Sequence, residues 1–296
     1  MKFLKALLLF GFFLIFLGTS FCFALEETTE RTFYLDGPGK LSISTVLGNI
    51  EISTHEGNTV QMTATKKLVG LPTDEAQKII NAIKIKTEQV GNQIFIKSEY
   101  FPMGFAKFWF DLKQLLTSGK TSNLEVKYHL LVPEEIEINF STVSGEVNIQ
   151  KVQGRCKGKT VSGLVVGKGV GKELSISTVS GKINITGQGR LFLKSVSGDV
   201  WVNVQKSEQA QDLTVSTVSG EAIIILPENA SVDLSVKTIS GRFSSEFPIL
   251  LEEGSLISDK QFQGKIAGSA QQTISCKIET VSGNISLRKK EEVIYL

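Results

Sequence analysis

Residues 174–185 read Leu-Ser-Ile-Ser-Thr-Val-Ser-Gly-Lys-Ile-Asn-Ile, and close copies of this unit recur along the chain. The shared core is Thr-Val-Ser-Gly or a near variant, with a worn early copy that begins at Thr45. The repeat glycines are Gly48, Gly145, Gly163, Gly181, Gly198, Gly220, Gly241 and Gly283. From Gly145 to Gly241 they fall 18, 18, 17, 22 and 21 residues apart. A supersecondary unit repeated at such a period is typical of a solenoid.

Alignment of the copies on their glycine predicts which side chains face inward. Aliphatic residues stand, with few exceptions, seven and five positions before the glycine and two and four after it. A valine or isoleucine also stands two before it in every copy. The pattern indicates strand, corner, strand, with a one-residue phase slip around the Ser-Thr pair. We therefore predict that the valines join the core, that the glycine relieves crowding or permits positive φ, and that threonine and serine form the corner.

The predicted fold is all-β: a single-domain parallel β-solenoid of about 8–9 rungs with a small α+β capping insertion near its N-terminal end. The expected organisation is a signal peptide (1–24), a first rung (25–53), the capping insertion (54–137), parallel repeats (138–290) and a tail (291–296). A degenerate rung at residues 262–266 would divide the gap between Gly241 and Gly283. The weakest rung should surround Gly163, since Gly158 and Gly167 leave two inward columns empty.

The capping insertion combines one helix with antiparallel strands. Pro72 and the acidic residues after it predict a helix start, and Gly91-Asn92 predicts a hairpin. Residues 124–132 alternate as a strand does. We expect these elements to cover the open edge of the first rung.

The N-terminus predicts export. A short basic stretch precedes an apolar run at residues 6–17. Cys22-Phe23-Ala24 then places small residues at the two positions that a signal peptidase recognises. We expect cleavage after Ala24, with an uncleaved anchor as the alternative, and a periplasmic, cell-surface or secreted protein. Removal of residues 1–24 would leave 30 basic and 30 acidic side chains. This balance argues against nucleic acid as a partner.

Two cysteines, Cys156 and Cys276, follow the expected cleavage site. In an exported protein such a pair invites a disulfide. Both stand seven positions before their glycines but several rungs apart, and this separation exceeds the roughly 7 Å Cα limit of a disulfide. We predict two buried free thiols.

One aromatic cluster, within residues 101–116, is a candidate interaction element. If residues 105–116 are helical, one face carries Phe105, Phe108, Trp109, Leu112 and Leu116. That face would suit peripheral membrane contact or a partner groove. The alternative is that these aromatics pack on the cap.

Candidate chemistry is sparse. His55 and His129 lie far apart, and no clustered ligand set predicts a metal or cofactor. Asp199 and Glu221 could be neighbours on adjacent rungs, where a solvated pair is the ordinary explanation. Trp201 is a candidate carbohydrate or protein contact. The Thr-x-Ser pairs form either an outward hydroxyl ladder or the corners themselves.

The successive Ser-Thr-Val-Ser-Gly-x-Ile-x-Ile units, with the prolines that follow Val132 and Leu226, resemble the bacterial putative-adhesin family over residues 36–290. The resemblance implies a parallel β-solenoid in a cell-envelope or surface setting and carries no catalytic residues. We expect an exported, non-enzymatic scaffold that binds an envelope or surface ligand, either a protein or a glycan. The alternatives are a carbohydrate-active β-helix enzyme and an ice- or surface-binding hydroxyl ladder.

Overall fold

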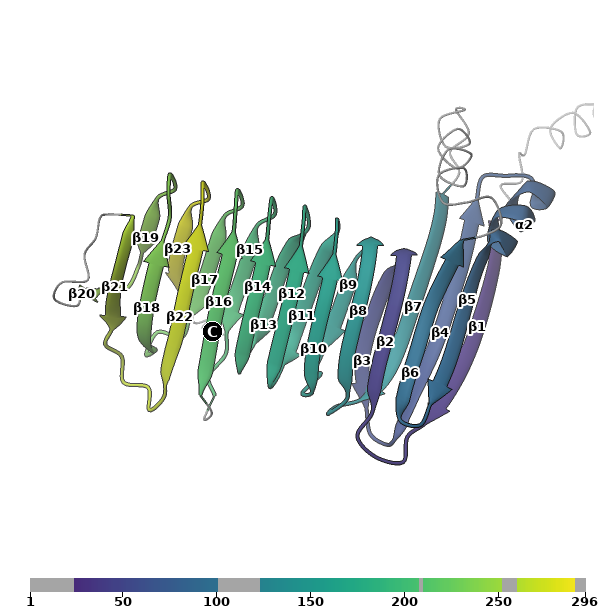
Figure 1. Cartoon of the computed structure of the whole chain (residues 1–296), viewed down its shortest axis with the longest axis horizontal. Coiled ribbons are helices and arrows are strands. Elements are labelled where there is room, and N and C mark those ends of the chain that lie inside the picture. Colours follow the sequence, from purple (N-terminus) through teal and green to yellow (C-terminus); the bar gives the residue numbers. More distant parts are fainter. Residues whose placement is uncertain (1–23, 101–122, 208–209, 252–259, 291–296) are drawn as a thin grey trace, which may run out of the picture.

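The computed structural model describes residues 24–100, 123–207, 210–251 and 260–290. Two large mixed sheets, of 11 and 12 strands, face each other along an elongated body (Figure 1). Within the described residues the one helix is α2 (Thr73–Ala82), which lies at the N-terminal end of the body (Figure 1). The prediction of an all-β chain with one helix is confirmed.

In both sheets the spatial order of the strands differs from their order in the sequence. From one edge to the other, the 11-stranded sheet contains β1 (Ala24–Tyr34), β4 (Thr59–Val69), β7 (Asn123–Pro133), β3 (Asn49–His55), β9 (Val147–Gln150), β11 (Leu164–Val170), β13 (Lys182–Gly187), β15 (Val200–Val204), β17 (Ala222–Leu226), β23 (Ile285–Lys289) and β19 (Phe243–Ser245). The 12-stranded sheet contains β20 (Leu250–Leu251), β21 (Gln261–Ile266), β18 (Ser231–Lys237), β22 (Thr273–Thr280), β16 (Gln211–Thr217), β14 (Arg190–Ser195), β12 (Glu173–Thr178), β10 (Arg155–Thr160), β8 (Glu137–Ser144), β2 (Lys40–Leu47), β6 (Gln93–Tyr100) and β5 (Ile83–Val90).

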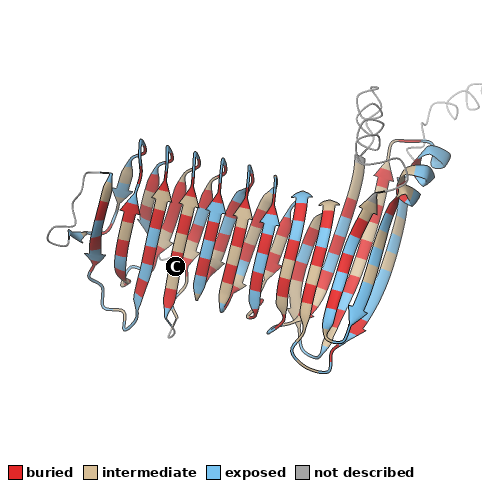
Figure 2. Ribbon diagram, in the orientation of Figure 1, coloured by how far each residue is buried: buried red, intermediate tan, exposed pale blue. Residues whose placement is uncertain are grey.

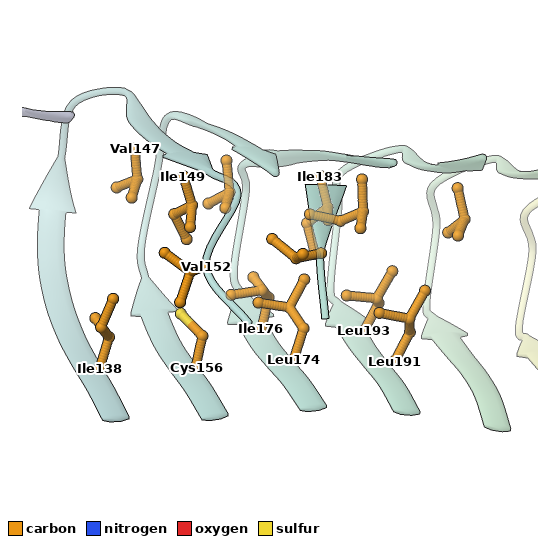
Figure 3. Packing of buried hydrophobic residues seen from close by; sticks show 14 of the residues in the cluster. Ile138, Val147, Ile149, Val152, Cys156, Leu174, Ile176, Ile183, Leu191 and Leu193 are labelled. Atoms are coloured by element: carbon orange, nitrogen blue, oxygen red, sulfur yellow. The ribbon is translucent and has the colours of Figure 1, made fainter. Parts of the chain in front are cut away.

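Each Thr-Val-Ser-Gly corner connects a strand of the 12-stranded sheet to a strand of the 11-stranded sheet. Neighbouring repeats pair in parallel and in register, so that Cys156 lies between Ile138 and Leu174. Alternate residues face the space between the sheets, which gives the banding of buried and exposed positions along the strands (Figure 2). Inward aliphatic side chains from successive repeats pack into one continuous core (Figure 3).

The corner differs from the prediction, because its valine faces solvent and its threonine faces inward. Val179 is 46% exposed, whereas Thr178 is 4% exposed. The same outward position is shared by the equivalent residues Val143, Val161, Val196, Val218, Ile239 and Val281. The phase slip therefore lies at Val-Ser, two residues later than the expected Ser-Thr. The buried hydroxyls bond the corner backbone: the Gly181 N–H donates to Thr178 Oγ1 at 2.9 Å, and the Thr160 hydroxyl donates to a carbonyl oxygen at 3.0 Å.

The repeat glycines stack directly on one another. A Cβ atom at Gly198 would lie 1.7 Å from the carbonyl oxygen of Gly181, and one at Gly220 would lie 2.0 Å from that of Gly198. Gly163 in addition has a φ of +124°. The prediction that glycine relieves crowding or permits positive φ is confirmed, and crowding by the preceding repeat is the more general cause.

The N-terminal end differs from the predicted organisation. Strand β1 pairs antiparallel with β4, so the first repeat consists of β2 and β3 and does not include the start of the predicted 25–53 rung. Strands β6 and β7, predicted as part of an antiparallel cap, pair in parallel with β2 and β3 and form a further repeat. The hairpin around Gly91-Asn92 and the helix are present as predicted. Antiparallel strands β1, β4 and β5 lie outside this added repeat.

The C-terminal end contains a strand insertion that the sequence period did not predict. Strand β22 lies between β16 and β18, so the repeat of Gly283 separates the repeats of Gly220 and Gly241. Residues 262–266 belong to β21, which pairs antiparallel with β18; the predicted degenerate rung there is wrong. The repeats pair in the same register and have equivalent corners. Two repeats that are not consecutive in the sequence can therefore pair as neighbours, and the order of the repeats in the sequence does not dictate their order in space.

The two inward columns predicted to be empty around Gly163 are filled from neighbouring strands. A Cβ atom at Gly158 would lie 1.9 Å from the Phe140 ring, which occupies the space above this glycine. At Gly167 the side chain of Ile185 lies 2.9 Å from the same position. Large residues thus pack against glycine in the adjacent repeat, so the empty columns on which the expected weakness rested are not present.

Cys156 and Cys276 are both buried and free, as predicted. Cys156 lies within the aliphatic core (Figure 3). Burial raises the pKa of each thiol to about 12. The reactive thiolate is therefore suppressed in the folded chain.

We expect neither thiol to react with a disulfide reagent near neutral pH while the chain is folded, and both to react in denaturant. Since the pKa of each folded thiol is raised, the stability gained by keeping the thiol protonated is present below the unfolded pKa of about 8.5. It is lost as the pH rises from there toward 12. Thiol titration with and without denaturant, with peptide mapping, tests this. A Cys156–Cys276 disulfide, or rapid labelling of the folded chain, would contradict it.

Candidate functional site

The aromatic candidates Phe105, Phe108, Trp109 and Leu112 lie outside the described residues, so their membrane or partner role stays a prediction. Strand β6 ends at residue 100 and β7 begins at residue 123. The end of β6 and the start of β7 thus lie at the corner where other repeats carry Val-Ser-Gly. In the described ranges, no helix has the length and apolar character needed to span a bilayer.

Trp201 lies on β15, on the outer face of the 11-stranded sheet, and is 44% exposed. Its neighbours in register are Asn184 and Ile223. The structure thus leaves this candidate accessible to a ligand.

Two of the residues considered for chemistry, His55 and Asp199, have structural partners. The two ring nitrogens of His55 lie 2.8 Å from the carbonyl oxygens of Glu56 and Thr59. Asp199 forms an ion pair with Lys182 at 3.2 Å, and its carboxylate accepts the backbone N–H of Glu221 at 3.1 Å. In the part of the chain that the structure describes, no group of three or more His, Cys, Asp or Glu side chains could hold a metal ion.

The outer face of the 12-stranded sheet carries two adjacent rows without an acidic residue across seven neighbouring strands. We call these rows the lysine strip: Phe95 and Lys97 on β6, Ser42 and Ser44 on β2, Asn139 and Ser141 on β8, Lys157 and Lys159 on β10, Ser175 and Ser177 on β12, Phe192 and Lys194 on β14, and Thr214 and Ser216 on β16. At about 4.8 Å per strand the strip is roughly 29 Å long. Each end of the strip meets one lysine and one glutamate, Lys86 and Glu88 on β5 and Lys277 and Glu279 on β22.

The lysines of the strip carry positive charge that the sheet does not neutralise. Lys157, Lys159 and Lys194 form no ion pair with any described residue, and all three are exposed. Their neighbours in register are serine and asparagine side chains. Lys97 alone is paired, at 3.5 Å from Glu99. The strip is thus a locally cationic surface on a chain whose charges nearly balance.

A Phe-x-Lys sequence occurs twice in the strip, at residues 95–97 and 192–194. In both copies the phenylalanine and lysine face outward around a buried aliphatic residue. Phe95 is 40% exposed and Phe192 is 39% exposed. They lie in the same row, five strands and about 24 Å apart, with Lys157 and Lys159 on a strand between them.

Part of the strip is hollowed. A hollow of about 460 Å³ lies over strands β2 and β8, between β6 and β10. Its floor includes Ser42, Ser44, Asn139 and Ser141, and its sides carry Phe95, Lys97, Lys157 and Lys159. Short polar residues between long side chains form a shallow trough that crosses these strands.

Each long edge of the strip has a different character. One edge is a row of alternating charge: Lys40, Glu137, Arg155, Glu173, Arg190 and Asp212. Lys40 contacts Glu137 at 2.8 Å, and this hydrogen bond lowers the pKa of the Glu137 carboxyl. The other edge is the row of exposed valines at the corners. Glu137 and Glu173 are thus ion-paired within their own row.

Sequence reasoning missed the lysine strip. The two Phe-x-Lys copies are visible in the sequence, yet only the spatial order of β6, β2, β8, β10, β12 and β14 brings them into one row. A signal existed at the positions six and four before each glycine, which hold mainly Ser and Lys in the repeats around Gly48, Gly163 and Gly181.

The sequence profile of the Toastrack DUF4097 family matches residues 39–288. A solved structure of a putative cell adhesion protein from Clostridium sporogenes is 17% identical, covers 90% of this chain and 100% of its own, and has a TM-score of 0.38. The corresponding values for a putative adhesin from Bacteroides fragilis are 14%, 88%, 97% and 0.36. A putative lipid binding protein from Parabacteroides distasonis gives 12%, 90%, 97% and 0.36.

No curated protein sequence matches the chain significantly. The family assignment therefore rests on the profile match, and it confirms the resemblance drawn from the repeat units.

Proposed function

This chain belongs to the Toastrack DUF4097 family, and we propose that it is an exported, non-enzymatic scaffold that binds a cell-envelope or surface ligand, in the manner of an adhesin. The observation that carries the proposal is the lysine strip, an exposed and acid-free surface on an otherwise charge-balanced protein. Because one hydrophobic cluster runs through both sheets, we take the repeats as a single-domain solenoid of about 8–9 rungs that presents this face as a rigid platform.

We base the proposed export on the basic and apolar residues at the N-terminus. Cleavage after Ala24 would leave Leu25 to Tyr34 paired with β4. The edge of the 11-stranded sheet would thus keep its outermost strand after processing.

The ion pairs and hydrogen bonds of the polar side chains favour a binding role over the enzyme and ice-binding alternatives. Asp199, a candidate acid of a carbohydrate-active enzyme, is engaged by Lys182 and by backbone. The motif threonines, candidates for an outward ice-binding ladder, are buried and bond the corners. By contrast, Lys157, Lys159 and Lys194 of the lysine strip form no ion pair with a described residue.

Cell fractionation followed by crosslinking and pull-down tests the proposed function. We expect a processed chain outside the cytoplasm, crosslinked to an envelope or surface component through the 12-stranded sheet. A matched chain without residues 1–24 should stay in the cytoplasm. Recovery of the full-length chain in the cytoplasm, or an exported chain with no crosslinked component, would overturn the proposal.

A further inference from the structure

We propose that the lysine strip binds a linear anionic polysaccharide, one that carries carboxylate groups along its length and runs across the strands. The inference rests on the proposed function, because it names the ligand class of the same surface. Three properties of the strip support it: its charge, its width and its free hydroxyl groups.

The charge of the strip selects an anionic ligand. Lys157 and Lys159 stand two residues apart on β10, and Lys97 and Lys194 lie on strands to either side. The two rows hold no carboxylate from β6 to β16, while acidic residues occur directly beyond both ends. A flexible lysine ammonium is a strongly hydrated point charge that suits repeated contacts along a charged chain.

The width of the strip selects a single chain. Glu137, Glu173 and Asp212 lie two residues from the strip on the same strands, in the row of alternating charge. A flat anionic membrane would also cover this row, which adds no net positive charge because its three acids alternate with Lys40, Arg155 and Arg190. A chain that follows the two rows meets the lysines and leaves the acids at its side. The trough over β2 and β8 runs in the same direction.

The serine hydroxyl groups and the exposed phenylalanine rings of the strip favour a sugar as the ligand. The side chains of Ser42, Ser44, Ser141, Ser175 and Ser177 form no hydrogen bond with a described residue. Each hydroxyl can both donate to and accept from a sugar hydroxyl. Phe95 and Phe192 offer ring faces in the same row, and the C–H face of a sugar ring packs well on such a surface.

The test uses the purified chain and a galacturonic acid oligomer as the probe, with binding measured by calorimetry at two salt concentrations. We expect binding that weakens as salt rises, because the contacts are exposed and charged. The double variant Lys157→Ser/Lys159→Ser should weaken binding about tenfold. The double variant Phe95→Ser/Phe192→Ser should weaken it several-fold.

Matched controls use the other surfaces of the chain. Lys168→Ser/Lys206→Ser removes the same charge from exposed positions outside the strip, and Tyr34→Ser removes an exposed aromatic from β1 in the opposite sheet. Both controls should bind the probe as the unchanged chain does. Equal losses in the controls and the strip variants would overturn the inference, as would absence of binding to the oligomer.

Three further probes separate the ligand classes: a neutral glucose oligomer of equal length, a thymidine oligonucleotide and phosphatidylglycerol vesicles. We expect weak binding to all three, and binding of the oligonucleotide or vesicles as tight as that of the uronate oligomer would overturn the sugar assignment. The strip variants are also crosslinked in cells. If they stay exported and crosslinked to the same component, the proposed function stands and the ligand class fails; a cytoplasmic chain fails the proposed function whatever the oligomer does.

Discussion

Replacement of Gly198 by alanine is expected to lower the free energy of unfolding by about 3 kcal/mol or more, and to be the most damaging single methyl addition among the glycines that the structure describes. The added Cβ would lie 1.7 Å from the carbonyl oxygen of Gly181 and 2.6 Å from its carbon. Both atoms are backbone in the adjacent repeat, so no side chain can rotate away. Relief requires separation of paired strands in both sheets, which breaks their hydrogen bonds. Urea denaturation followed by far-ultraviolet circular dichroism measures the loss.

The matched control is Gly37→Ala. Its Cβ would lie 3.5 Å from Asn92 Nδ2, an ordinary contact distance, and we expect a change within about 0.5 kcal/mol. Similar stability losses in Gly37→Ala and Gly198→Ala would show that the repeat glycines are not held by the stacking of their backbones.

Replacement of Phe140 by alanine is expected to destabilise the chain by about 3–5 kcal/mol. The Phe140 ring is 3% exposed and fills the space above Gly158, so its loss opens a cavity that glycine cannot fill. Gly158→Ala alone should cost about 1–3 kcal/mol, because the added methyl meets the ring at 1.9 Å. The double variant Phe140→Leu/Gly158→Ala removes the ring and adds the methyl, and should be more stable than the sum of its single variants predicts.

A double-mutant cycle by urea denaturation measures this coupling. As the control, Gly158→Ala is combined with Leu213→Ala, a core change three strands away on β16. These two losses should add within about 0.5 kcal/mol. Additive losses for the Phe140 and Gly158 pair would show that the ring does not supply the missing side chain.

Much of the scaffold follows from local sequence pattern. Period-two aliphatic residues around a recurring glycine require strands joined by corners, and the spacing of the copies requires that they stack. The free state of Cys156 and Cys276 follows from the same alignment, since residues in one column of distant repeats cannot meet. Helix α2 and the hairpin at Gly91-Asn92 carry their own short-range signals.

The corner shows where local pattern is insufficient. By side-chain polarity alone, the valine of the Thr-Val-Ser-Gly corner resembles a core residue and the threonine resembles a surface residue. The threonine is nevertheless buried, because its hydroxyl oxygen accepts a backbone N–H in the corner, at 2.9 Å in the case of Thr178. Since consecutive side chains of a strand point to opposite faces, the valine that follows the threonine then points outward. Hydrogen-bond satisfaction therefore overrides side-chain polarity here.

The repeating unit and its glycine are determined locally: the unit by the alternation of apolar and polar residues, and the glycine by the need for a residue without a Cβ atom. Both can therefore be read from the sequence. The order of the units was not local. Because the repeats are interchangeable, β22 can lie between β16 and β18, and β6 can lie beside β2. The lysine strip depends on that second placement, since Phe95 and Phe192 share a row only when strands far apart in sequence stack in parallel at one register.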